Sequence, residues 1–88
     1  MEKPKITIYG TTWCRDCYQA LNILKSHNIN YQWIDIDQDQ QAEKFVIQTN
    51  RGFRSVPTIL FEDGSILVEP SQSELQSKLI TLTQLNEK

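Results

Sequence analysis

The two cysteines of the chain limit its fold and its chemistry more than any other feature of the sequence. They stand at Cys14 and Cys17 in the segment YGTTWCRDCYQAL, and the remaining residues contain none. Alternating β-branched and aromatic residues at 5–9 predict a strand just before the pair. Apolar residues at helical spacing across 15–26 predict a helix just after it. The pair is therefore expected where a strand ends and a helix begins.

The rest of the pattern predicts a single α/β domain that spans residues 1–88. The segment YQWIDID, at 31–37, alternates like a second strand, so that strand, helix and strand form a parallel βαβ unit. Asp37 or Asp39 can cap a second helix that runs to about residue 49. PTILF and SILV flank Glu-Asp-Gly as a hairpin, and SQSE at 71–74 matches a capping box that opens a last helix. The expected order is β-α-β-α-β-β-α, a mixed sheet of four strands with helices on both faces.

Composition excludes several classes of partner. The net charge is −2 and there is no basic stripe, so no nucleic acid is expected to bind. No apolar run approaches the roughly 20 residues of a membrane helix, and the N-terminus lacks the core of a signal peptide. The expected location is therefore the cytoplasm, where paired cysteines are usually redox-active or metal-binding.

Three roles are open to the cysteine pair: a staple, half of a metal site, or a redox couple. A staple closing so short a loop would contribute roughly 2 kcal/mol, against roughly 4.7 for a loop of 100 residues. A zinc site wants four ligands, and the chain adds only His27, at the far end of the predicted helix. No metal is therefore expected within one chain, although a cluster shared between two chains stays open.

The redox role suits the position of the pair. A helix N-terminus carries unpaired N–H groups and a positive partial charge, which favour the thiolate of Cys14. Cys17 lies one turn further along the helix and is expected to be less exposed. We therefore predict that Cys14 attacks a substrate disulfide, and that Cys17 then attacks the sulfur of Cys14 and releases the reduced substrate.

Two neighbouring features bear on substrate binding. Pro57, in the segment SVPT, lies just before the predicted hairpin. A cis Val56–Pro57 bond would leave the Val56 backbone free to pair with an incoming peptide, but an ordinary trans proline at the start of an edge strand fits equally well. Trp13 precedes the first cysteine, and we interpret it as a flat apolar platform for a substrate rather than as packing.

The segments TTWCRDC and RSVPT resemble the glutaredoxin-like redoxins of the thioredoxin superfamily, over nearly the whole chain. The resemblance implies the thioredoxin fold, with Cys14 as nucleophile and Cys17 as resolving cysteine. It also implies a cis Pro57, a Val56 backbone that pairs with the bound thiol, and an Arg54 that faces the carboxylate of the ligand. Within this group, WC..C, VPT and DGS…PS..EL look most like mycoredoxins, small reductases that use mycothiol.

The chain departs from the glutathione-using members at three places. Thr11 stands where they usually have a lysine, and Arg15-Asp16 replaces their Pro-Tyr spacer. Glu69 and Pro70 stand where their Gly-Gly grips the glutamyl end of glutathione. These departures favour a thiol other than glutathione.

The sequence thus predicts a monomeric disulfide reductase that acts on protein disulfides or mixed disulfides without a prosthetic group. Mycothiol, bacillithiol, glutathione or a flavoenzyme would recycle it, and Arg54, the Val56 backbone and donors at Ser71 would hold one anionic group of a small thiol. Two alternatives stay open. One is a dimer that carries a [2Fe–2S] cluster through Cys14, which absorbance would reveal. The other is an inactive interaction module, which a small-disulfide assay would reveal.

Overall fold

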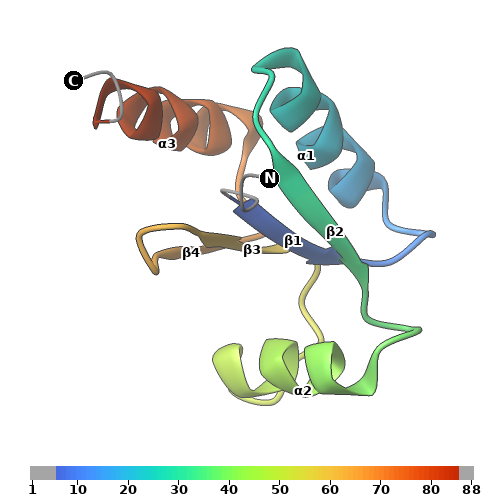
Figure 1. Cartoon of the computed structure of the whole chain (residues 1–88). Helices are drawn as coiled ribbons and strands as arrows, with labels where there is room; N and C mark the ends of the chain where they lie inside the picture. Colours follow the sequence, from blue (N-terminus) through green and yellow to red (C-terminus); the bar gives the residue numbers. More distant parts are fainter. Residues whose placement is uncertain (1–5, 86–88) are drawn as a thin grey trace.

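The structure, a computed structural model, describes residues 6–85 and contains the seven expected elements in the expected order (Figure 1). They are β1 (Ile6–Gly10), α1 (Arg15–Ser26), β2 (Tyr31–Asp35), α2 (Gln40–Thr49), β3 (Thr58–Phe61), β4 (Ile66–Val68) and α3 (Gln72–Leu85).

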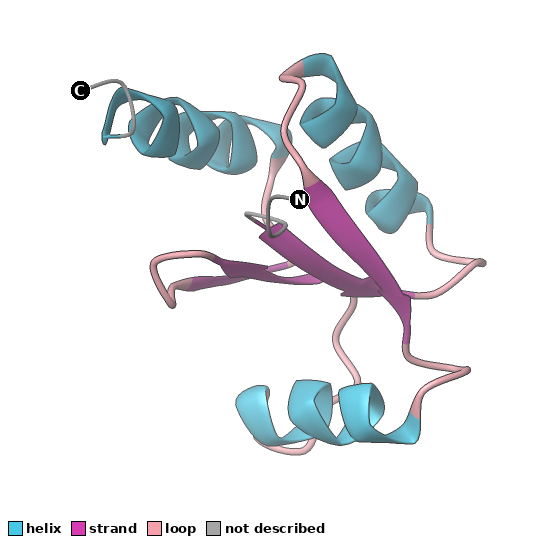
Figure 2. Ribbon diagram, in the orientation of Figure 1, coloured by secondary structure: helices cyan, strands magenta, loops and turns pink. Residues whose placement is uncertain are grey.

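The strands form one mixed sheet in the order β2-β1-β3-β4. β1 and β2 are parallel, as the βαβ pattern predicts, whereas β3 is antiparallel to both β1 and β4. Figure 2 shows α1 and α3 on one face of the sheet and α2 on the other. After the carboxyl end of β1, a short loop therefore leads to the start of α1, which packs on one face of the sheet.

Each face of the sheet has its own apolar core. The core under α1 and α3 includes the fully buried Ile8, Leu24, Ile59 and Leu79. A smaller core under α2 consists of Ile36, Ala42 and Val46. Strand β2 contributes to both cores, because Tyr31 and Trp33 pack on the first and Ile34 packs on the second, next to Ile36, which directly follows the strand. This division is the alternation that the sequence predicts.

Local signals set the ends of the helices. After α1, Asn28 takes a left-handed conformation with φ of 55°, a backbone that asparagine tolerates and that ends helices. Asp39, not Asp37, caps α2, because its side chain accepts a hydrogen bond from the Ala42 amide at 3.0 Å. After α2, Gly52 has φ of 100° and its amide donates to the Ile47 carbonyl at 2.8 Å.

Some boundaries differ from the predicted ones. The strand predicted at 31–37 ends at Asp35, because that carboxylate accepts a hydrogen bond from the Asp37 amide at 2.9 Å and turns the chain. The first strand runs one residue further than predicted, to Gly10, and residue 5 lies outside the described part. Phe45 of α2 is half-buried and packs against the smaller core. Within residues 6–85, no helix is long and apolar enough to cross a membrane.

Candidate active site

Cys14 occupies the junction between β1 and α1, as the sequence predicts. It is the N-cap of α1, with extended backbone at φ of −95° and ψ of 111°. Its sulfur accepts a hydrogen bond from the Cys17 amide at 3.1 Å, and its thiol donates to the Val56 carbonyl at 3.8 Å. Both cysteines are free thiols. An N–H group at the helix mouth therefore points at the sulfur where an anion would form.

Cys17 is more deeply buried than its partner, with no exposed surface against 8% for Cys14. Burial, followed by the hydrogen bond with Cys14, raises the pKa of the Cys17 thiol to about 12, while a backbone hydrogen bond with Thr11 opposes this rise. Cys17 therefore stays protonated at neutral pH, and reagents in solvent reach Cys14 first.

Gly10 makes room for the buried thiol. A methyl group at this position would lie 2.7 Å from the Cys17 sulfur and 2.7 Å from the Trp33 ring. Gly10 was not identified from the sequence, because no neighbouring residue in the sequence requires a glycine there. A side chain is excluded only because Trp33 of the neighbouring strand occupies the space beside Gly10 in the folded protein. The glycine at the end of a strand, four residues before the cysteine, was the available signal.

The Val56–Pro57 peptide bond is cis, as the resemblance implied. Pro57 is buried, and the Val56 carbonyl lies against the Cys14 sulfur. Pairing of β3 with its neighbours begins only at Thr58, so Val56 lies just outside the ladder. The backbone of this segment therefore forms one wall beside Cys14.

Trp13 and Arg54 share a carboxylate on the surface next to Cys14. Trp13 is 68% exposed, and its indole Nε1 donates to Asp37 Oδ2 at 3.0 Å. The Arg54 guanidinium forms ion pairs with Asp37 Oδ1 and with Glu43 Oε2, the second at 2.6 Å. The hydrogen bonds from Arg54 and Trp13 lower the pKa of Asp37, and those to Glu43 and Asp37 raise the pKa of Arg54. Sequence reasoning missed Glu43 and considered Asp37 only as a cap.

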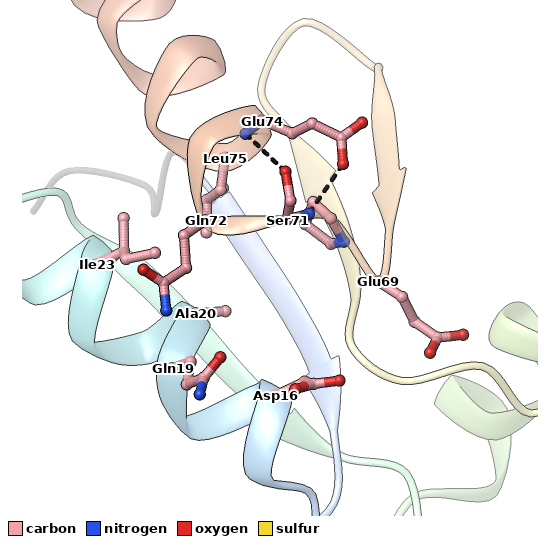
Figure 3. A pocket seen from close by; sticks show the side chains of 10 residues that line it. Asp16, Gln19, Ala20, Ile23, Glu69, Ser71, Gln72, Glu74 and Leu75 are labelled. Atoms are coloured by element: carbon pink, nitrogen blue, oxygen red, sulfur yellow. Dashed lines mark hydrogen bonds between the residues drawn. The ribbon is translucent and has the colours of Figure 1, made fainter.

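Ser71 lies beside a hollow between α1 and the start of α3, with a volume of about 360 Å³. Figure 3 shows Asp16 on α1 and Glu69 on the segment before α3 at the two sides of this hollow, and Glu74 also lines it. Glu69 has φ of 47° where glutathione-using relatives were expected to have glycine. The hollow therefore carries three carboxylates.

The capping box predicted at 71–74 is present. The Ser71 amide donates to Glu74 Oε1 at 2.8 Å, and the Glu74 amide donates to the Ser71 hydroxyl at 3.1 Å (Figure 3). An anion that sought the Ser71 amide would have to displace the Glu74 carboxylate.

Among the described residues, no group of three or more histidines, cysteines or carboxylates is placed to hold a metal ion. His27 caps the opposite end of α1 from Cys14.

Comparison with known proteins points to one family. A family model described as glutaredoxin matches residues 6–66. A Mycobacterium tuberculosis protein that carries the name glutaredoxin is 40% identical over 77 residues, which cover 88% of this chain and 92% of that protein. Mycoredoxin 1 of Corynebacterium glutamicum is 38% identical over 77 residues, covering 88% and 95%.

The fold also has solved counterparts. The crystal structure of the thioredoxin-like protein BC3987 superimposes with a TM-score of 0.72 at 26% identity, covering 83% of this chain and 97% of that one. The sheet order and the three helices described above are thus those of the thioredoxin-like fold.

Proposed function

The chain belongs to the glutaredoxin family, whose members are thiol-disulfide oxidoreductases, and on this premise we propose that Cys14 is its nucleophile and Cys17 its resolving cysteine. The observation that carries the assignment is the difference between the two thiols. Cys14 caps the helix at the molecular edge with an N–H group pointing at its sulfur, whereas Cys17 is sealed beneath it.

In the proposed first step, the Cys14 thiolate attacks one sulfur of a substrate disulfide. The sulfur–sulfur bond breaks, one substrate thiolate leaves and takes a proton from water, and Cys14 is left in a mixed disulfide. The second step needs the Cys17 thiolate. Once Cys14 is in a disulfide, its hydrogen bond and its charge no longer raise the pKa of Cys17, so burial is the main cause that remains.

Cys17 then attacks the Cys14 sulfur, the second substrate thiol leaves, and the protein holds a Cys14–Cys17 disulfide. Two electrons have passed to the substrate. Two molecules of a small thiol, or one hydride-derived electron pair from a flavoenzyme, would restore the dithiol.

The substrate backbone is proposed to align along Val56 and Pro57, and Trp13 to lie under its apolar part, because these groups surround the Cys14 sulfur or adjoin it.

The reductant is proposed to be a small thiol other than glutathione, of the mycothiol or bacillithiol kind, or a flavoenzyme. Three observations support this proposal. Thr11 is wholly buried and offers no cation, Glu69 stands beside the hollow, and Arg54 is already paired with carboxylates. Ser71 contributes only if its amide leaves Glu74.

Reduction of a small disulfide by wild type, Cys14→Ser and Cys17→Ser tests the assignment. Cys14→Ser should lose all thiol exchange. Cys17→Ser should keep the first attack and accumulate a mixed disulfide that mass spectrometry detects. An active Cys14→Ser together with a dead Cys17→Ser would reverse the two roles.

A further inference from the structure

We propose that Asp37 and Glu43 select substrates by charge, so that disulfides with neutral or cationic groups react in preference to those with carboxylates. The inference rests on the proposed function of Cys14 and adds a substrate class to it. It concerns three side chains, Arg54, Asp37 and Glu43, which we call the Arg54 cluster.

The guanidinium of the Arg54 cluster is already paired with the two carboxylates of the same cluster. Arg54 Nε donates to Glu43 Oε2 at 2.6 Å, and Nη2 donates to Asp37 Oδ1. Two carboxylates thus face one guanidinium, and the cluster carries a formal charge of −1. A carboxylate of an incoming ligand would have to displace one of them to reach Arg54. Even before contact it would meet net negative charge.

Two segments of the chain connect the Arg54 cluster to the Cys14 sulfur. The second oxygen of Asp37 accepts the indole N–H of Trp13, the residue that precedes Cys14. Arg54 lies two residues before Val56, whose carbonyl contacts the Cys14 sulfur. A group attached to a disulfide at Cys14 can therefore lie close to this cluster on the side of Trp13 and Val56.

The charges on the other side of Cys14 have the same sign. Asp16 lies two residues after Cys14, and with Glu69 and Glu74 it lines the hollow between α1 and α3 (Figure 3). No cation lines that hollow. Within the Arg54 cluster and this hollow, a substrate carboxylate thus finds no unpaired cation, whereas an ammonium group is attracted. Arg15, which is exposed and directly follows Cys14, is a cation outside both regions.

The effect should be moderate, because the side chains of the Arg54 cluster are about one third exposed. Exposed ion pairs of this kind are worth little, so one carboxylate should change the relative rate of a charged substrate by about fivefold or less. The selectivity should also weaken as salt screens the charges.

Three disulfides with matched arms test the proposal: cystamine, bis(2-hydroxyethyl) disulfide and 3,3′-dithiodipropionate, which are cationic, neutral and anionic. The measured quantity is kcat/KM for each, expressed as the ratio of charged to neutral substrate. Comparing the ratio between wild type and variants cancels the intrinsic reactivity of each disulfide.

Glu43→Gln should raise the anionic-to-neutral ratio several-fold and lower the cationic-to-neutral ratio, and added salt should reduce both changes. Asp37→Asn provides a second variant with the same expected direction. Glu62→Gln is the matched control: it removes the same charge from the exposed β3–β4 turn, on the opposite side of the molecule from the β1–α1 segment (Figure 1), and should leave both ratios as in wild type.

Two failures can be told apart. If wild type reduces none of the three disulfides, the proposed function is wrong. If it reduces them but Glu43→Gln and Asp37→Asn give the ratios of Glu62→Gln, the Arg54 cluster does not select by charge and this inference is overturned.

Discussion

Cys14 and Cys17 carry the same functional group and are both largely buried, yet Cys14 keeps 8% of its surface exposed and Cys17 none. Cys14 caps a helix at the edge of the sheet, and Cys17 lies against Gly10 and the Trp33 ring with no exposed surface. At the scale of the residue, the chemistry therefore depends on the space around each sulfur as much as on the sulfur itself.

Iodoacetamide should label Cys14 well before Cys17 in the folded, reduced protein. Because the pKa of Cys17 is raised to about 12, its thiolate fraction grows only as pH approaches that value, and labelling of Cys17 should stay slow from pH 7 to 10. Mass spectrometry after timed alkylation measures both sites. The unfolded protein is the control and should label both at once; equal rates in the folded protein would contradict the described burial.

Gly10→Ala should destabilise the protein by about 1 to 3 kcal/mol, the usual cost of overpacking a core. The added methyl would push apart the Cys17 sulfur and the Trp33 ring, each 2.7 Å away. Denaturant unfolding measures the stability, and persistence of the mixed disulfide measures how well a displaced Cys17 resolves it. Wild-type stability together with normal resolution would show that the site has more room than described.

At the scale of the element, the β3–β4 hairpin and α3 support each other. Asp63 accepts hydrogen bonds from the Ser65 amide at 2.9 Å and the Ser65 hydroxyl at 2.6 Å, which fix the turn. Lys78 of α3 pairs with Asp63 at 3.1 Å and places its ammonium 5.3 Å from the centre of the Phe61 ring. The turn is thus held both by its own bonds and by the last helix.

Gly64→Ala should cost about 1 kcal/mol in the free energy of unfolding, for a different reason from Gly10→Ala. Gly64 has φ of 90°, which side-chain-bearing residues rarely adopt, but an added methyl would meet nothing within 4 Å. Gly64→Asn should cost less than Gly64→Ala, because asparagine tolerates positive φ. Denaturant unfolding of both variants checks this order, and the reverse order would contradict it.

At the scale of the whole molecule, the sheet places negative charge on both sides of Cys14, the Arg54 cluster on one and the α1–α3 hollow on the other. We expect this distribution to influence which small thiol recycles the protein, since each region includes or contacts a residue next to Cys14 in the chain, Trp13 for the Arg54 cluster and Asp16 for the hollow.

Glutathione should recycle the oxidised protein more slowly than a sugar-type thiol without carboxylates, of the mycothiol kind, at matched concentration. Glutathione brings carboxylates to a site where the cation of the Arg54 cluster is already paired and where three carboxylates line the neighbouring hollow. The rate of loss of the Cys14–Cys17 disulfide with each thiol measures this, with dithiothreitol as the control for general reducibility. Clear superiority of glutathione would show that the missing lysine and glycines matter little.

Local rules predicted most of the fold, because caps, turns and alternation depend on residues close in sequence. Asp39, Asn28 and the Ser71 capping box behave as these rules require. The Arg54 cluster could not be predicted in this way, since Glu43 and Asp37 lie 11 and 17 positions before Arg54 and the three residues meet only when α2 packs against the sheet. The role of Gly10 likewise depends on the parallel pairing of β1 with β2.

The shared carboxylate of Asp37 makes Trp13 an optical reporter of what happens at Arg54. One oxygen of the Asp37 carboxylate accepts from the Trp13 indole and the other accepts from the Arg54 guanidinium. A change in the bond to Arg54 should therefore alter the bond to Trp13. Trp33 packs against the core and can be replaced by phenylalanine, which leaves Trp13 as the sole tryptophan, to be excited selectively over the tyrosines. Asp37→Asn should then lower the fluorescence anisotropy of Trp13, because a neutral amide restrains the ring less than an ionised carboxylate does.

Acid should have the same effect as that substitution, but only at unusually low pH. The hydrogen bonds from Arg54 and Trp13 lower the pKa of Asp37, so its carboxylate stays ionised as pH falls through the normal range of an aspartate. An anisotropy that drops at that normal range would mean that the indole tumbles free of Asp37. A later drop would make the emission of this tryptophan a direct, label-free readout of any anion that takes the carboxylate's place on Arg54.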